Sequence, residues 1–146
     1  MNDMMRSNLM RISAWMEEKG YGAMGKESKT VIIMAPNPDM DSDLTEIKIV
    51  LYLSDGALSL LAYAPISAER DRRLSRLLNQ MNLFEDQGQF QYEENGSLLW
   101  CCHILLAEEW IGNEVLNEVL EAGCRNAGKL YDAFMNMDPD SADPAE

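Results

Sequence analysis

The sequence has few cysteines, few basic residues and no long apolar run, and each shortage excludes a class of protein. Its three cysteines form neither a disulfide framework nor a CxxC pair, so we expect reduced thiols and a cytoplasmic location. Twelve basic residues against 25 acidic ones give a net charge of −13, which argues against nucleic acid and anionic membranes as partners. The first residues lack the basic start and apolar run of a signal peptide. The longest apolar stretches, residues 98–102 and 104–107, are too short to span a bilayer.

Motifs for catalysis or metal binding are also missing. No phosphate-binding loop, dinucleotide motif or nucleophile elbow occurs. Alternating aspartates at residues 39–43 resemble the start of a calcium loop, but Leu44 and Val50 stand where that loop needs glycine and glutamate. His103 could pair with Cys101 as base and nucleophile, although packing within a half-buried strand explains both. We therefore expect a protein that is not an enzyme and has no cofactor and no metal.

The 146 residues suit one domain, and 47% apolar with 25% charged residues is typical of a globular protein. Residues 1–136 are predicted to form a single α+β domain. Residues 137–146 contain three aspartates, two prolines and a final glutamate, so they are predicted to form a disordered acidic tail.

Helical spacing of apolar residues predicts three helices. The first covers residues 4–20. The second begins at Ser67, a suitable N-cap, and its leucine stripe continues to Met81. The third runs from about Glu108 to Phe134.

Five strands are predicted between these helices. They cover residues 29–35, residues 45–53, residues 57–64, which Pro65 ends, and the two arms of a hairpin over residues 87–106. The order α-β-β-β-α-β-β-α with hairpin links favours a mainly antiparallel sheet with helices packed on it.

Both faces of this sheet carry large apolar side chains. A two-residue turn at residues 95–96 would pair Phe90 with Cys101 and leave apolar groups on either side of the hairpin. In a sheet with one solvent-exposed face, apolar and polar residues would alternate more regularly along each strand. We therefore expect the second face to be partly covered, by a helix of this chain or by a partner. The candidate protein-binding residues on the sheet are Val50, Tyr52, Leu61, Tyr63 and Trp100.

Four arginines between Arg70 and Arg76 form a basic cluster in an otherwise acidic chain. Arg72, Arg73 and Arg76 share one arc of the predicted helix. A solvated helix face, attracting the acidic tail of the same chain, explains them, and contact with an acidic partner segment is the alternative. These three arginines complete the candidate protein-binding residues.

Three short segments carry a resemblance to a known family, namely LLNQMN (77–82), GQFQY (88–92) and ENGSL (94–98). They resemble the YbjN-like family of bacterial proteins, which are described as sensory transduction regulators. That family is similar in fold to the class I type III secretion chaperones.

In element order the resemblance covers roughly residues 5–134, and its specific part is about residues 74–99. It implies a cytoplasmic, non-enzymatic protein that acts through protein contacts as a homodimer, and it transfers no active-site residue. Residues 26–29 stand where the chaperones usually carry an acidic-glycine turn, which favours the regulator branch.

Three functions follow as hypotheses. The first is a non-enzymatic regulator or chaperone-like domain that docks a protein partner on its sheet or its second helix. The second is a dedicated class I chaperone for a type III secretion effector. The third is a small-molecule sensor, which a deep pocket beside Cys101 and His103 would support.

Overall fold

The computed structural model describes residues 3–20, 30–39, 41–42, 44–54, 56–105 and 112–137, and it confirms the predicted order of elements. Residues 138–146 of the predicted tail and the predicted start of the last helix near Glu108 lie outside the described residues. The elements are α1 (Asp3–Lys19), β1 (Thr30–Pro36), β2 (Glu46–Ser54), β3 (Ala57–Ser67), α2 (Arg72–Asn82), β4 (Gln89–Tyr92), β5 (Ser97–Leu105) and α3 (Asn113–Met135).

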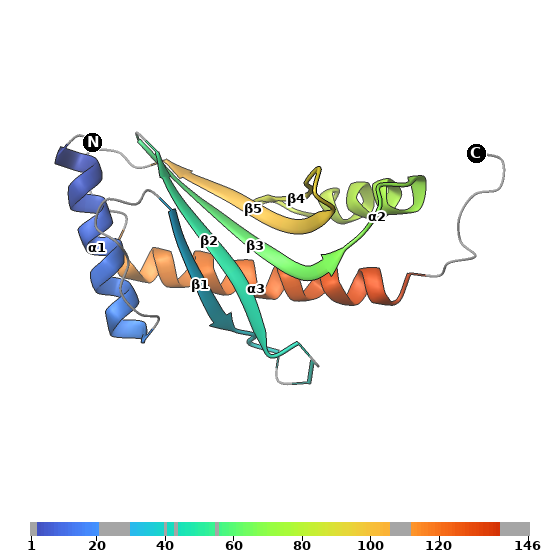
Figure 1. Cartoon of the computed structure of the whole chain (residues 1–146), viewed down its shortest axis with the longest axis horizontal. Coiled ribbons are helices and arrows are strands. Elements are labelled where there is room, and N and C mark those ends of the chain that lie inside the picture. Colours follow the sequence, from blue (N-terminus) through green and yellow to red (C-terminus); the bar gives the residue numbers. More distant parts are fainter. Residues whose placement is uncertain are drawn as a thin grey trace.

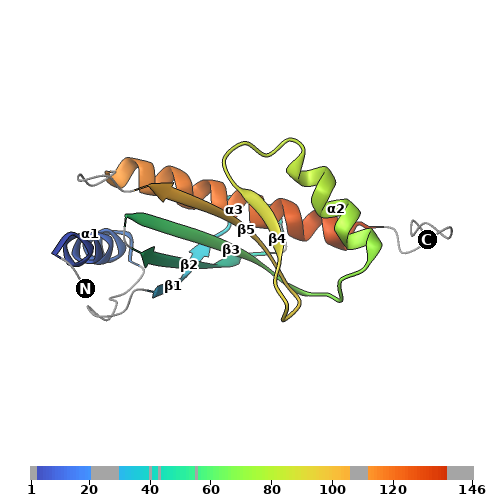
Figure 2. The same cartoon turned by 90° about the horizontal axis from the view of Figure 1, so that it is seen from above.

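The five strands form one antiparallel sheet in the order β1-β2-β3-β5-β4. The long helix α3 lies along one face of this sheet, α1 lies at its β1 end, and α2 lies beside β4 (Figures 1 and 2). We call the side toward α3 the core face and the opposite side the second face. No described helix is long and apolar enough to cross a membrane.

The core lies between the core face and the helices. Alternate residues of β1, β2 and β3 are buried against α3 and α1, as the two-residue period of a strand requires. At Gly123 of α3 an added Cβ would lie 2.8 Å from Leu60 Cδ2, so the missing side chain lets the helix approach the sheet closely. Trp15 of α1 is buried and its Nε1 donates a hydrogen bond to Asn117 Oδ1 of α3 at 2.6 Å, which ties the two helices together.

The hairpin between β4 and β5 differs from the prediction by one residue. Glu93 N donates to Ser97 O and Gly96 N donates to Glu93 O, both at 2.9 Å, and Gly96 has φ +93°. These bonds enclose a three-residue loop with a left-handed glycine at its end, a common hairpin geometry. Phe90 therefore pairs with Trp100, and the predicted pairing of Phe90 with Cys101 is wrong.

This shift changes which side chains share a face. Phe90 and Tyr92 join Trp100 on the core face, while Gln89 and Gln91 lie on the second face. The hairpin is thus more one-sided than predicted, and its apolar aromatic residues belong to the core.

The segment from β3 to α2 also differs. Pro65 was predicted to end its strand, but β3 continues to Ser67. The pairing of β3 with β5 shifts between Ala64 and Ser67, and such an irregularity tolerates a proline that cannot donate a ladder hydrogen bond. The N-cap of α2 is Asp71 and not Ser67, because the Asp71 carboxylate accepts a hydrogen bond from Leu74 N at 2.9 Å.

Candidate functional site

The second face of the sheet brings side chains from four strands into aligned rows. Ile32, Val50, Leu61 and Cys101 are successive partners across β1, β2, β3 and β5. The row on one side of these residues contains Met34, Lys48, Tyr63 and Leu99. The row on the other side contains Thr30, Tyr52, Ser59 and His103. We call six of these residues the sheet patch: Ile32, Met34, Val50, Tyr52, Leu61 and Tyr63.

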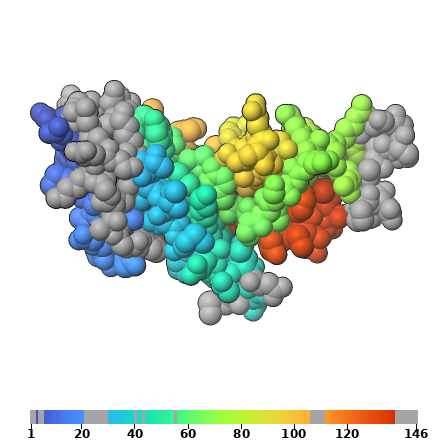
Figure 3. Space-filling model, viewed as in Figure 1, coloured from blue at the N-terminus to red at the C-terminus, as the bar shows by residue number. Residues whose placement is uncertain are grey.

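The sheet patch is open at its β1 and β2 side. Ile32 is 62% exposed, Met34 51% and Tyr52 42%, while the other three residues are half-buried. Figure 3 is viewed from this side, and strands β1, β2 and β3 form much of the visible surface. None of the described helices lies over them (Figures 1 and 2). The expectation that a helix of the same chain covers this face is therefore not met by the described residues.

One end of the sheet patch is polar. The Tyr63 hydroxyl donates to the Glu93 carboxylate, and Lys48 Nζ lies 5.2 Å from the centre of the Tyr63 ring. Burial, together with the hydrogen bond and the negative charge of Glu93, raises the pKa of Tyr63 far above its usual range, so this hydroxyl stays a donor. Met34 and Pro65 join these residues around a hollow of about 460 Å³.

The structure separates the candidate residues that the sequence predicted. Val50, Tyr52, Leu61 and Tyr63 lie together on the second face. Trp100 lies on the core face and is only 1% exposed, so it is a core residue and is not part of the sheet patch. Ile32 and Met34 were missed because Val31, Ile32, Ile33 and Met34 are all apolar, so the sequence of β1 does not show which face is buried. The two-residue period of a strand does place Ile32 and Met34 on the face opposite Val31 and Ile33.

The arginines of α2 belong to another surface. Arg72 and Arg76 are exposed and, with Leu83, line a hollow of about 440 Å³ along the helix. Arg73 forms an ion pair with Asp71 at 3.4 Å. Because α2 lies beside β4 at the far end of the sheet from β1 (Figure 2), these side chains do not join the sheet patch.

Cys101 and His103 share the second face but lack the arrangement of a nucleophile and its base. Burial raises the pKa of the Cys101 thiol, whereas a reactive thiolate needs a lowered pKa. His103 Nδ1 lies 2.7 Å from Ser59 Oγ, so its hydrogen bond goes to a hydroxyl.

The aspartate loop between β1 and β2 has its own hydrogen bonds. Asn37 Oδ1 accepts from Asp39 N and Asp39 Oδ1 accepts from Asp41 N, which are turn contacts. Asp43 lies outside the described residues. Within the described ranges no group of three acidic, cysteine or histidine residues is placed to hold a metal.

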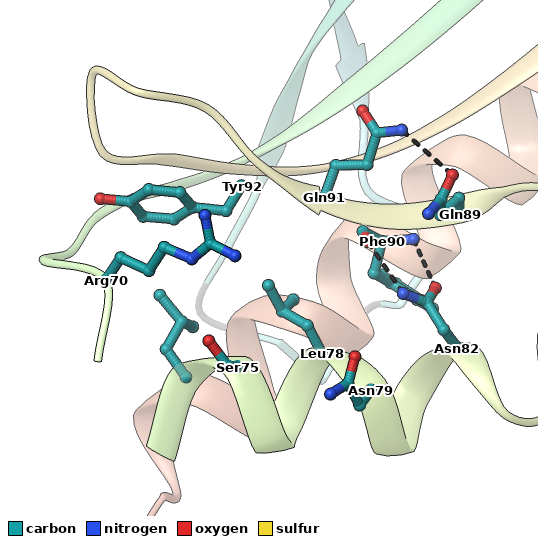
Figure 4. Close-up of a pocket in the computed structure, with 10 residues that line it drawn as sticks. Arg70, Ser75, Leu78, Asn79, Asn82, Gln89, Phe90, Gln91 and Tyr92 are labelled. Carbon is teal, nitrogen blue, oxygen red and sulfur yellow. Dashed lines mark hydrogen bonds between the residues drawn. The ribbon is translucent and has the colours of Figure 1, made fainter. Parts of the chain in front are cut away.

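A third hollow, of about 320 Å³, lies between α2 and β4 (Figure 4). At one end Asn82 Oδ1 accepts from Phe90 N at 2.7 Å and Asn82 Nδ2 donates to Phe90 O at 3.0 Å. At the other end the Tyr92 hydroxyl donates to Ala68 O at 3.0 Å. Asn82 thus fastens α2 to β4, and Tyr92 fastens β4 to the segment that precedes α2. We call this hollow the α2–β4 pocket.

Comparison with known proteins supports the fold and nothing narrower. No known protein family matches the chain, and no curated protein matches it. A chain in the structure of the heterodimeric complex ExoU-SpcU from the type III secretion system of Pseudomonas aeruginosa is similar, with a TM-score of 0.57 and 13% identity. The match covers 83% of this chain and 95% of that chain. The chain therefore has a type III secretion chaperone-like fold.

Proposed function

We propose that the chain is a non-enzymatic, cytoplasmic protein of the regulator or chaperone-like type, and that the sheet patch receives a partner protein. The supporting observation is that Ile32, Met34 and Tyr52 are exposed side by side on strands that no described helix covers. Covering exposed apolar area releases about 25 cal/mol per Å². A contiguous apolar face of this kind is typical of a protein interaction site.

The edge of the sheet patch indicates how a partner is oriented. Lys48, Tyr63 and Glu93 offer a cation, an aromatic ring and a carboxylate within one hollow. Polar groups at the rim of an apolar surface give orientation and specificity, while the apolar centre supplies most of the affinity. The partner segment therefore presents apolar side chains toward β1 and β2 and polar groups toward Glu93.

Affinity purification with matched variants tests this proposal. Ile32→Glu and Tyr52→Glu place a charge on the sheet patch, and Met10→Glu is the control because Met10 is 65% exposed on α1. The expected result is one set of proteins recovered with the wild type and Met10→Glu and lost with both sheet variants. Thermal unfolding should show that all variants fold. A partner retained equally by the sheet variants contradicts the proposal.

A dedicated chaperone for a type III secretion effector is the alternative. It is favoured by one observation, the similarity to a chain of the ExoU-SpcU complex. The YbjN-like regulator reading rests on residues 77–98 and on residues 26–29, and the latter lie outside the described residues. An effector gene beside the gene of this chain, and loss of that effector's secretion when the chain is deleted, would favour the chaperone. Isolation from secretion genes would favour the regulator.

We further propose a homodimer, as the resemblance implies. Leu83 and Phe84, directly after α2, are 76% and 91% exposed, and a second copy would shield them. Light scattering after size exclusion should give twice the mass of 16.5 kDa, and Phe84→Glu should return the protein to the monomer mass. A monomeric wild type at high concentration would rule the homodimer out.

A further inference from the structure

The α2–β4 pocket contains polar groups that the protein leaves unused. Arg70 precedes α2, and its guanidinium points into the pocket with its centre 6.0 Å from the centre of the Tyr92 ring (Figure 4). Ser75 and Asn79, one helical turn apart on α2, line the same space. Among the described residues, none of these three side chains has a hydrogen-bond or ion-pair partner.

The pocket is also positive in a strongly negative chain. The net charge is −13, yet the described residues that line the pocket include Arg70 and no aspartate or glutamate. A guanidinium that lacks a carboxylate partner at close range favours an anion beside it, and its planar fork matches a carboxylate with two parallel hydrogen bonds.

The other polar residues of the lining already have hydrogen-bond partners: Asn82 bonds the backbone of Phe90, and Gln91 bonds Gln89. The remaining lining residues are apolar or aromatic. Leu74 and Leu78 are buried side chains of α2 that line the pocket, and the Tyr92 ring forms the facing wall (Figure 4). The ring is held in place by its hydroxyl bond to Ala68 O, and Ala68 N in turn donates to Gly96 O at 2.9 Å. The wall is therefore preorganised, which reduces the entropy lost on binding.

We propose that the α2–β4 pocket binds a small organic anion, with its carboxylate on Arg70 and its flat apolar body between Tyr92 and the two leucines. A volume of about 320 Å³ is at the small end of the range for ligand pockets. The two hydrogen bonds between Asn82 and Phe90 join α2 directly to β4, so an extended polypeptide cannot run through that end of the pocket. Ser75 and Asn79 supply the remaining hydrogen bonds to the ligand.

Paired carboxylates and amides test this site by nuclear magnetic resonance titration. The probes are benzoate and indole-3-acetate, each matched with its uncharged amide, benzamide and indole-3-acetamide. We expect the carboxylates to shift the amide signals of residues 70–92 and to bind about tenfold or more tightly than the amides, since a charge-assisted hydrogen bond is lost with the charge. Binding of neither carboxylate, or equal binding of each amide, would overturn the proposal.

Arg70→Gln should weaken carboxylate binding by about tenfold or more, whereas Arg125→Gln, an exposed arginine on α3, should leave it unchanged. Tyr92→Leu should weaken the binding of indole-3-acetate more than that of benzoate, because the larger ring loses more of its contact with the Tyr92 wall.

Unfolding midpoints identify any variant that fails to fold. In that case the comparison of each carboxylate with its amide in the wild type decides alone. Ile32→Glu should bind both carboxylates normally, which separates this site from the sheet patch. Retention of carboxylate binding in folded Arg70→Gln would overturn the assignment.

Discussion

Trp100 is the side chain whose position most alters the interpretation of the sheet. It is 1% exposed on the core face, its ring lies against Gly88, where a Cβ would come within 2.7 Å of two ring carbons, and it also packs near Gly123. Its Nε1 has no hydrogen-bond partner among the described residues. The ring therefore stabilises the fold by packing and not by hydrogen bonding.

Replacing Trp100 should separate these two contributions. Trp100→Ala should lower the free energy of unfolding by about 3–5 kcal/mol, because a large core cavity is left. Trp100→Phe should lower it by about 1–2 kcal/mol, since most of the ring remains and an unpaired donor is removed. Urea denaturation followed by circular dichroism measures both. Equal losses in the two variants would show that the indole nitrogen matters more than the ring.

The buried thiols predict how stability depends on pH. Burial raises the pKa of Cys102 and of Cys124 to about 11 from an ordinary 9.0. Between these values the unfolded chain loses thiol protons that the folded chain keeps, so the free energy of unfolding should fall as the pH rises from 9 to 11. Cys124→Ala should flatten this dependence in urea denaturation at successive pH values. Parallel curves for variant and wild type would contradict the assignment.

Helix α2 shows how neighbouring elements determine where a helix begins. Ser67 and Asp71 are both good capping residues, and the choice between them depends on whether β3 continues through Pro65. It does, because β3 pairs with β5 as far as Ser67 and Ser97. Strand pairing thus moves the helix start to Asp71, and it leaves Arg70 outside the helix, where its side chain can enter the α2–β4 pocket.

Asp71→Ala should lower the free energy of unfolding by about 1 kcal/mol, the usual value of an N-cap. Ser67→Ala, the matched control, should change it by less than about 0.5 kcal/mol. The hydrogen bond from Leu74 N lowers the pKa of Asp71. The cap's contribution should therefore be present at neutral pH and be lost as the pH falls below the ordinary carboxyl value and through the lowered pKa of the folded protein. Equal effects of the two substitutions in urea denaturation would contradict the cap.

The order of strands and helices could be predicted because buried positions recur at the period of a strand or a helix, and apolar residues recur at the same spacing in the sequence. Ile47, Ile49, Leu51 and Leu53 alternate in the sequence and are all buried on one face. The hairpin register could not be predicted, because Asn95-Gly96 suits both a two-residue and a three-residue loop. One residue of difference moved Phe90 to the other side of the hairpin.

The candidate site was predicted in part for the same reason. Val50 and Tyr52 lie opposite the buried residues of β2, so alternation alone places them on the second face. The face of Trp100 depends on the pairing of β3 with β5. The paired residues Ser67 and Ser97 are 30 positions apart in the sequence, and no local signal sets that register. The α2–β4 pocket was missed because it joins Arg70 to Tyr92, and only the folded chain brings these two side chains together.

The sheet as a unit should unfold locally from its outer strands. β3 lies in the centre between β2 and β5, while β1 and the four-residue β4 are outermost. Native-state hydrogen exchange should therefore show the strongest amide protection in β3 and β5 and weaker protection in β4, where local opening disrupts fewer contacts. Stronger protection in β4 than in β3 would contradict this order.

The two hydrogen bonds between Asn82 and the backbone of Phe90 also limit how many molecules can join edge to edge. A linear polymer of sheets needs two receptive outer strands on every subunit, because each subunit must accept a neighbour on either side. At Phe90 the outward N–H and C=O of β4 are already bonded to a side chain, in the way a further strand would bond them. A fibre that grew by adding a strand to β4 would first have to break both hydrogen bonds at Phe90. Asn82 therefore protects this edge of the sheet against amyloid-like stacking.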